Sequence, residues 1–134
     1  MGAMRNVLCS LIIIIPVLLG VWLSVSKQRK INPTISYKLE DKIYKLRTAK
    51  TPGEWEQGLM YVTKPAGYDG MIFMFPDKDY RTFWNKNTLV DLTIYWMDND
   101  RIVQKDALPS ITKSEKIVTV GSPEKVNTII EIIK

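Results

Sequence analysis

The 134-residue sequence contains no histidine and a single cysteine, Cys9. A zinc site assembled from His and Cys side chains is therefore excluded, and one cysteine cannot close a disulfide within the chain. The side chain that most often transfers protons near neutral pH is also missing. We therefore expect no metal and no cofactor, and any acid–base catalysis would depend on Lys, Asp or Glu.

Charged residues are absent from residues 6–26, which are rich in Leu, Ile and Val. At about 1.5 Å per residue, a helix of this length spans the roughly 30 Å hydrocarbon core of a bilayer. Pro16 and Trp22 suit a membrane helix, so the run predicts an N-terminal transmembrane helix. A cleaved signal peptide is the alternative, because Ser24-Val25-Ser26 resembles a small-x-small cleavage site. A buried helix of a soluble protein is a third interpretation.

Basic residues are concentrated directly after the apolar run. Residues 27–50 hold eight Lys and Arg against two acidic residues, whereas residues 51–134 hold ten against twelve. Nucleic-acid binding usually requires a basic face on the folded domain, so we expect no nucleic-acid partner. The basic segment suits anionic lipid head groups instead. The expected partner is thus the lipid bilayer, contacted through residues 6–26.

The chain is predicted to divide into three parts. Residues 1–26 form a membrane anchor or uncleaved signal, residues 27–34 a linker, and residues 35–134 one domain large enough to bury its own core. Signal-like leaders normally send the following domain outward, so we expect a single-pass protein with an extracytoplasmic domain. The basic residues that follow the run favour the opposite orientation by the positive-inside rule.

Hydrophobic patterning in the domain predicts about eight short strands and one short helix. Residues 35–39 and 42–47 alternate as a hairpin, and Met71–Phe75 is a continuous apolar strand buried on both faces. Pro76–Asp79 is expected to turn the chain. Further strands are predicted at 80–84, 92–97, 101–107, 117–120 and 127–133. The expected fold class is mostly β, a small β-sandwich or partly closed barrel.

The helix is predicted immediately after the first hairpin. Thr51 can act as the N-cap, Pro52 fits the first helical position, and Glu54 completes a capping box. Gly58 suits the left-handed residue that ends a helix. The helix should therefore be about two turns long.

Three sequence blocks resemble one protein family. They are Thr51-Pro52-x-Glu54-x-x-x-Gly58-Leu59-Met60, then Gly70 to Phe75, then Phe83-Trp84-Asn85-Lys86-Asn87-Thr88 followed by Leu92-Thr93-Ile94. In this order they are similar to domain of unknown function family 192, also catalogued as uncharacterised protein family 0127. The resemblance implies a compact, mostly β domain that often follows an N-terminal signal or anchor, and it implies no reaction. Asn85 and Asp91 depart from the residues that the family usually carries there.

The densest cluster of polar and aromatic residues is Phe83–Thr88. Trp84 could stack on a flat ligand while Lys86, Asn87 and Thr88 supply hydrogen-bond donors and an anion contact. Alternatively, Asn and Thr after a strand simply form a turn, and Lys86 lies over aromatic surface.

An enzymatic interpretation pairs Lys86 with Asp91 as acid and base, tuned by Arg81. The alternative is an ordinary surface ion pair. Ser110-Ile111-Thr112-Lys113 matches the S-x-x-K spacing of some acyl-transfer enzymes, but its companion motifs are missing and we interpret it as chance. Asp98-Asn99-Asp100 lacks the Gly and distal Glu of a calcium loop and is predicted to be a hairpin turn.

We interpret the chain as a membrane-tethered, non-enzymatic module that binds a small ligand, an envelope polymer or a protein. The ligand-binding candidates are Arg81, Trp84, Lys86, Asn87, Thr88 and Asp91. Ten aromatic residues fall between Trp55 and Trp96. A sugar- or polymer-binding face would require two or three of them to be exposed, and otherwise they fill the core. The alternatives are an envelope enzyme that uses Lys86 with Asp91 or Arg81, and a structural accessory subunit.

Overall fold

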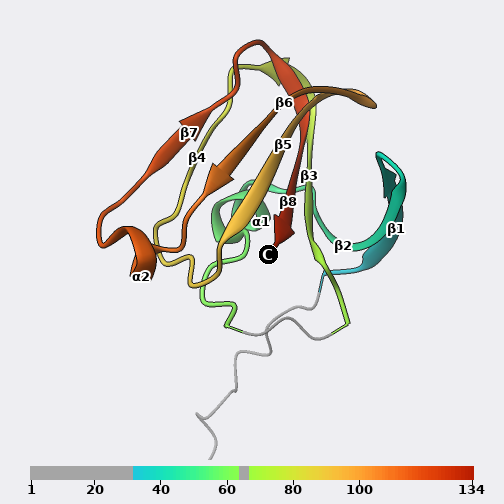
Figure 1. The fold of residues 1–134 in the computed structure, drawn as a ribbon. Coiled ribbons are helices and arrows are strands. Elements are labelled where there is room, and N and C mark those ends of the chain that lie inside the picture. Colours follow the sequence, from blue (N-terminus) through green and yellow to red (C-terminus); the bar gives the residue numbers. More distant parts are fainter. Residues whose placement is uncertain (1–31, 64–66) are drawn as a thin grey trace, which may run out of the picture. The chain divides into compact units, whose positions relative to one another are not determined.

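The computed structural model describes residues 32–63 and 67–134. Eight strands and two short helices follow one another along these residues (Figure 1). They are β1 Thr34–Leu39, β2 Lys42–Ala49, α1 Pro52–Gln57, β3 Gly70–Asp79, β4 Thr82–Trp84, β5 Leu92–Asp98, β6 Arg101–Leu108, α2 Ile111–Ser114, β7 Thr119–Gly121 and β8 Val126–Ile133. The predicted mostly-β class is confirmed.

The predicted transmembrane helix at residues 6–26 lies outside the described residues. Within 32–63 and 67–134, no helix has the length and apolar character needed to cross a bilayer.

Six strands form one sheet in the order β1-β2-β3-β8-β5-β6, and β4 pairs with β7 in a separate two-stranded sheet. All pairs are antiparallel except β2 and β3, which run parallel because α1 carries the chain across between them. The β1–β2 hairpin bends out of the line of the other strands (Figure 1), and the hydrogen bond from Tyr37 to Asp100 joins it to the turn between β5 and β6. Because β1 and β6 are edge strands that do not pair with each other, the sheet is open and the barrel alternative is not supported.

The central strands bury side chains on both faces of the sheet. In β3, Met71 and Phe73 pack on one face together with α1, whereas Ile72 packs on the other. In β8, Ile129 and Ile130 divide in the same way. The continuous apolar run at Met71–Phe75 therefore has the buried, two-sided environment that its composition predicted.

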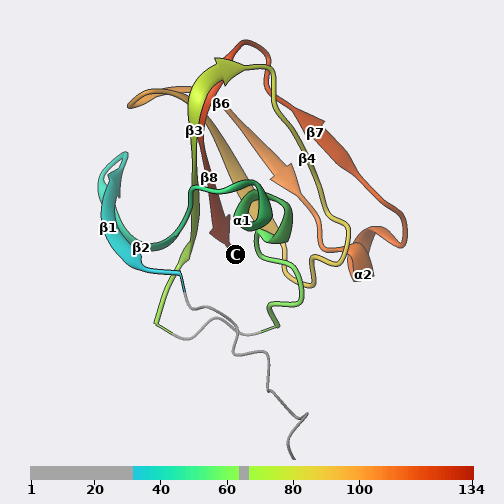
Figure 2. The same ribbon diagram turned by 180° about the vertical axis from the view of Figure 1, so that it is seen from behind.

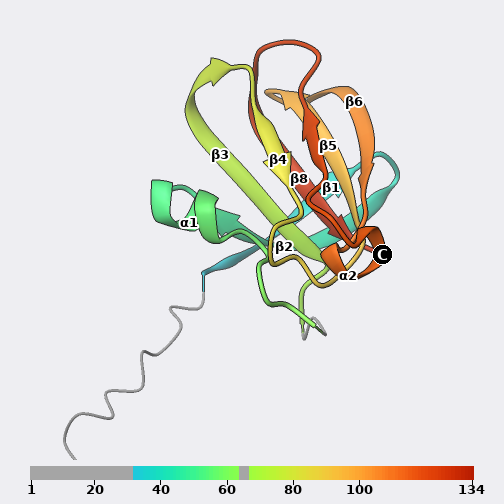
Figure 3. The same cartoon turned by 90° about the vertical axis from the view of Figure 1, so that its left-hand side faces the viewer.

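The helix α1 forms at the residues that the capping pattern indicated. The Thr51 hydroxyl accepts a hydrogen bond from the Glu54 amide at 3.4 Å, and the Glu54 carboxylate accepts one from the Thr51 amide at 3.2 Å. Gly58 ends the helix with a φ of 45°. The predicted capping box is confirmed, whereas Gly58 has a ψ of −133° and so does not adopt the left-handed helical conformation that was predicted. Figures 2 and 3 show α1 beside the sheet from two directions.

Two predictions of secondary structure are wrong. Pro76–Asp79 does not turn the chain but extends β3, whose pairing with β8 is irregular between Met74 and Asp79. An edge or irregular position tolerates proline because no ladder hydrogen bond is needed from its nitrogen. The second short helix, α2, was not predicted. Ser110 caps it by accepting a hydrogen bond from the Lys113 amide at 3.2 Å.

Candidate functional site

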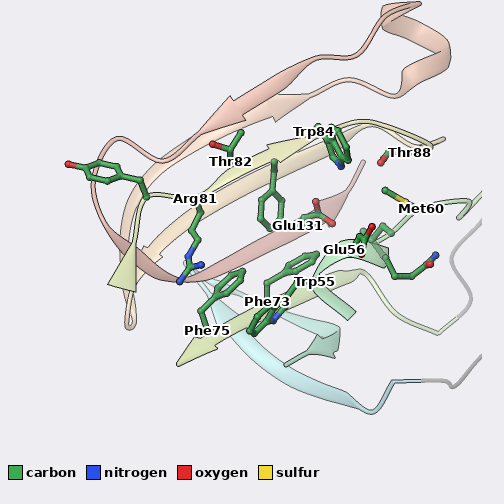
Figure 4. A pocket seen from close by; sticks show the side chains of 15 residues that line it. Trp55, Glu56, Met60, Phe73, Phe75, Arg81, Thr82, Trp84, Thr88 and Glu131 are labelled. Atoms are coloured by element: carbon green, nitrogen blue, oxygen red, sulfur yellow. The ribbon is translucent and has the colours of Figure 1, made fainter. Parts of the chain in front are cut away.

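A pocket of about 490 Å³ lies between α1, the β3–β4 region and β8 (Figure 4). Its walls combine aromatic rings with polar side chains. Its lining residues are Trp55, Glu56, Gln57, Gly58, Leu59, Met60, Phe73, Phe75, Tyr80, Arg81, Thr82, Phe83, Trp84, Thr88 and Glu131. Polar and apolar groups contribute almost equally to the lining, which makes it more polar than most small-molecule sites, and the volume falls in their usual range of roughly 300–1,000 Å³.

Glu131 is the buried ionisable residue of this pocket, and Thr88 is a second buried polar residue in its lining. Glu131 lies in β8 between Ile129 and Ile133, on the face that those two residues share in the core. Its cross-strand neighbours are Met71 in β3 and Ile94 in β5, both fully buried apolar residues. A carboxyl group therefore occupies a position where the pattern of the strand calls for an apolar side chain.

The environment of Glu131 favours its neutral form. The side chain is 5% exposed, and its Oε2 atom has no hydrogen-bond partner among the described residues. Desolvation by burial raises the pKa of Glu131 from 4.5 to about 8. At neutral pH the group is thus mainly a protonated carboxyl, which both donates and accepts hydrogen bonds. A strongly perturbed carboxyl in a pocket is a physical signature of a functional site.

Arg81 lines the same pocket from the segment between β3 and β4. Its guanidinium carbon lies 3.9 Å from the centre of the Phe75 ring, and its Nη2 donates to the Asp77 carboxylate at 3.0 Å. Its Nε atom is buried and has no hydrogen-bond partner within residues 32–63 and 67–134. The stack and the ion pair hold the guanidinium in place and leave one donor unused.

The predicted cluster at Phe83–Thr88 is divided by the structure. Trp84 and Thr88 line the pocket, whereas Lys86 and Asn87 do not. Lys86 lies over the Trp84 ring with its Nζ 5.1 Å from the ring centre. The Thr88 amide donates to the carbonyl of Asn85 at 2.9 Å, and Asn87 adopts a left-handed φ of 55°. These are the contacts of a turn after β4, so the turn interpretation describes the backbone while Trp84 faces the pocket.

Asn85 organises this turn from a fully buried position. Its side-chain amide donates to the Pro109 carbonyl and to the Ser114 hydroxyl, each at 2.8 Å, and its oxygen accepts from the Val118 amide at 2.8 Å. The departure from the family pattern at this position thus has a structural role. It ties the end of β4 to α2 and to the segment before β7.

Asp91 lies outside the pocket lining. It accepts hydrogen bonds from the Ser110 amide at 2.8 Å and from Lys113 Nζ at 3.2 Å, and the first of these is the main reason that its pKa is lowered. In the part of the chain that the structure describes, no ion pair joins Lys86 with Asp91, which pairs with Lys113, and Arg81 pairs with Asp77. The residues of the enzymatic interpretation therefore have other partners.

Asp98-Asn99-Asp100 forms the turn between β5 and β6, as the sequence predicted, with Asn99 at a φ of 52°. Asp98 pairs with Lys78 and with Arg101. Across residues 32–63 and 67–134, no group of three or more Asp, Glu, His or Cys is placed to hold a metal ion.

Sequence reasoning missed Glu131, Glu56 and Trp55 as pocket residues. Glu131 has a signal that could have found it, because it is the only charged residue within the apolar run from 129 to 133. The two neighbours on its own face are isoleucines, so a strand with this pattern places the carboxyl in the core. Glu56 and Trp55 carry no comparable signal, since a short helix can turn any of its sides to the sheet.

Comparison with known proteins gives a family and a fold. The family described as "Uncharacterized ACR", domain of unknown function 192, matches residues 35–134. A crystal structure of a protein of unknown function from Novosphingobium aromaticivorans DSM 12444 is 25% identical, with a TM-score of 0.59 over 75% of this chain and 71% of that chain. A "putative transcription regulator" from Sinorhizobium meliloti 1021 is 28% identical, with a TM-score of 0.58 over 75% of this chain and 78% of that chain.

No curated protein matches the sequence. The matched segment coincides with the β-rich domain and includes every residue that lines the pocket. On this match, the chain belongs to domain of unknown function family 192.

Proposed function

We propose that the domain binds a small molecule in the pocket beside α1, with Glu131 as the buried polar anchor of the ligand. The observation that carries the proposal is the Oε2 atom of Glu131, which is buried and unpaired at an apolar position of β8. Leaving a buried polar group unsatisfied typically costs about 1–3 kcal/mol. A ligand group that bonds to this carboxyl would recover that loss, whereas a purely structural strand would carry a hydrophobic residue here.

The size of the pocket favours a small ligand over a long polymer segment or a protein. A volume of about 490 Å³ suits one compact molecule. The exposed rings at the rim, Tyr80 at 63% and Trp84 at 46%, leave the pocket in contact with the surface. Among the three ligand types that the sequence allowed, the compact molecule is the one that these dimensions support.

The binding proposal is tested by screening a chemically mixed set of small molecules against the full chain by ligand-observed NMR. We expect hits whose binding is lost in Glu131→Leu and retained in Glu124→Leu, because Glu124 is a surface carboxylate that pairs with Arg101. Binding that is equal in both variants, or no hit at all, would refute a ligand site at Glu131.

We further propose that residues 6–26 tether this domain to the outer side of a membrane. The uncharged run of bilayer length supports this proposal. Ile117 is 52% exposed, so an Ile117→Cys substitution in a Cys9→Ser background provides one labelling site on the domain. An impermeant thiol reagent should label it in intact cells. Labelling that appears only after lysis would contradict the outward orientation.

An enzymatic role for Lys86 with Asp91 or Arg81 is not favoured by any contact of these residues. Lys86 lies over Trp84, Asp91 pairs with Lys113, and Arg81 pairs with Asp77. This alternative remains a prediction from the sequence.

A further inference from the structure

We propose that the ligand of this pocket is an uncharged, polyhydroxylated ring of the carbohydrate class. This inference rests on the proposed small-molecule function and specifies its ligand. It combines the charge of the lining, the two unpaired polar atoms and the exposed aromatic rings.

The positive and negative charges of the pocket lining are equal in number when Glu131 is protonated. Besides Glu131, the titratable side chains that line it are Glu56, Tyr80 and Arg81. Since Glu131 is buried in an apolar environment and mainly protonated, one carboxylate and one guanidinium remain. A neutral ligand enters such a pocket without bringing in an uncompensated charge.

Two unpaired polar atoms belong to side chains that line the pocket from different elements, Arg81 before β4 and Glu131 in β8 (Figure 4). In the described part of the chain, the Oε2 atom of Glu131 and the Nε atom of Arg81 are both buried without hydrogen-bond partners. One side chain can accept a hydrogen bond and the other can only donate. A hydroxyl group does both, so a ring with hydroxyls on several carbons can serve both side chains. Thr82 and Thr88 add further hydroxyls to the lining.

Besides hydrogen bonds, carbohydrate recognition requires aromatic rings that pack against the apolar face of the sugar. Tyr80 and Trp84 are 63% and 46% exposed, so two exposed rings are available to pack against a sugar. Tyr80 and Trp84 line the pocket. The C–H faces of a sugar ring are apolar and pack against such rings, while its edge of hydroxyls remains free for hydrogen bonds.

An organic cation is the main rival, because a carboxyl among aromatic rings can bind one. However, the chain's own cations already lie over two of the lining rings. Arg81 is 3.9 Å from the centre of the Phe75 ring, and Lys86 is 5.1 Å from the centre of the Trp84 ring. Each of these rings therefore already has one face covered by a cation of the chain, which leaves less ring surface for an incoming cation and favours the neutral ligand.

The test is calorimetric titration of the full chain with glucose, N-acetylglucosamine and a disaccharide, in a buffer or detergent without sugar head groups. Choline serves as the cation probe and benzoate as the apolar anion probe. We expect saturable saccharide binding and no binding of choline or benzoate at matched concentrations. Trp84→Ala and Tyr80→Ala should each weaken it at least about tenfold, whereas Tyr61→Ala, an exposed aromatic outside the lining, should leave it unchanged.

The two substitutions of Glu131 separate the ligand classes. Glu131→Gln keeps one donor and one acceptor, so it should bind saccharide within about threefold of the parent chain, whereas Glu131→Leu should lose binding. Equal losses in both variants, or binding of choline in place of saccharides, would overturn the carbohydrate assignment and leave the small-molecule proposal standing. Absence of every ligand from the pocket, in this titration and in the NMR screen, would refute both.

Discussion

The two faces of the six-stranded sheet differ in whether their polar side chains have hydrogen-bond or ion-pair partners. On the face that carries Leu46 and Ile130, the polar groups at the rim are paired. Tyr37 donates to Asp100 at 3.2 Å, and Glu40 accepts from Tyr95 at 3.5 Å and pairs with Lys105. These side chains connect the curled β1–β2 hairpin to β5 and β6 without any backbone pairing.

On the face that carries α1, a carboxyl group is buried and unpaired. Glu131 is adjacent in sequence to Ile130, and the alternation of β8 alone sends the two side chains to opposite faces. One face therefore has the paired rim expected of a structural core, whereas the other retains an unsatisfied group beside a pocket. The unpaired carboxyl on the pocket face lowers the stability of the fold. Natural proteins retain such destabilising groups mainly at functional sites, for example where a ligand binds.

The largest expected effect is a fall in stability with rising pH that originates at Glu131. Its pKa is raised from 4.5 to about 8 in the folded state. Below pH 4.5 the group is protonated in both states and its contribution is complete. Between pH 4.5 and 8 the unfolded chain releases the proton while the folded chain keeps it, so the free energy of unfolding falls by about 1.4 kcal/mol per pH unit and by up to about 5 kcal/mol in total.

Urea unfolding as a function of pH measures this slope. Glu131→Gln should flatten the curve between pH 4.5 and 8, because an amide does not titrate, whereas the surface variant Glu124→Gln should keep the slope. The carboxylates with lowered pKa, Asp91 and Asp98, lose their contributions only at lower pH and do not interfere. A parent chain with no slope in this window would show that Glu131 is not buried as a neutral group.

The next effect concerns the close approach of β3 to β8 at Gly70. A Cβ atom added to Gly70 would lie 1.9 Å from the Glu131 carbonyl oxygen, so Gly70→Ala must push the two strands apart. We expect a loss of about 3 kcal/mol in the free energy of unfolding. Gly53→Ala is the matched control, because nothing lies within 4 Å of its added atom and alanine favours the helix. Equal midpoints for the two variants would contradict the close approach.

A smaller effect is expected at the N-cap of α1, the helix that forms one wall of the pocket. Thr51→Ala removes the hydroxyl that accepts from Glu54 and should cost about 1 kcal/mol, whereas Thr51→Ser should retain most of the stability. Thermal unfolding of the three chains gives the comparison. If alanine and serine unfold at the same temperature, the cap does not hold the helix.

The smallest effect is expected on the opposite face. Glu40→Gln weakens the ion pair with Lys105 and should cost less than about 1 kcal/mol, because the Glu40 side chain is 47% exposed and that of Lys105 is 44% exposed. The difference from the parent chain should shrink further in 1 M salt, because exposed charges are screened there. If Glu40→Gln lowered the free energy of unfolding as much as ionisation of Glu131 does, the two faces of the sheet would not differ in the way described.

Much of the fold could be predicted from short-range patterns. The capping residues around Thr51 and Gly58 fixed α1, and the two-sided apolar run at Met71 fixed the central strand, because both signals depend on neighbours in the sequence. The extension of β3 through Pro76 could not be predicted, since proline is tolerated only where the partner strand leaves an irregular position. The short helix α2 depends on its packing against the turn at Asn85 in the same way.

The candidate site was predicted only in part. Arg81, Trp84 and Thr88 line the pocket, whereas Lys86, Asn87 and Asp91 lie outside its lining. Side chains that are close in sequence at the end of a strand can point in different directions. Proximity along the chain therefore did not predict which of these residues line the same pocket. Glu131 lies 47 residues from Trp84 in the sequence and joins it only through the pairing of distant strands.

By itself, the sequence determined the elements whose causes are local: the capped helix, the alternating strands, and a family membership carried by three motifs. The tertiary structure alone decided that a carboxyl near the C-terminus meets the aromatic residues after β3. The physical reason is that burial raises the pKa of Glu131, and its cross-strand neighbours, Met71 and Ile94, come from two other strands. Those neighbours exist only after β3, β8 and β5 have paired.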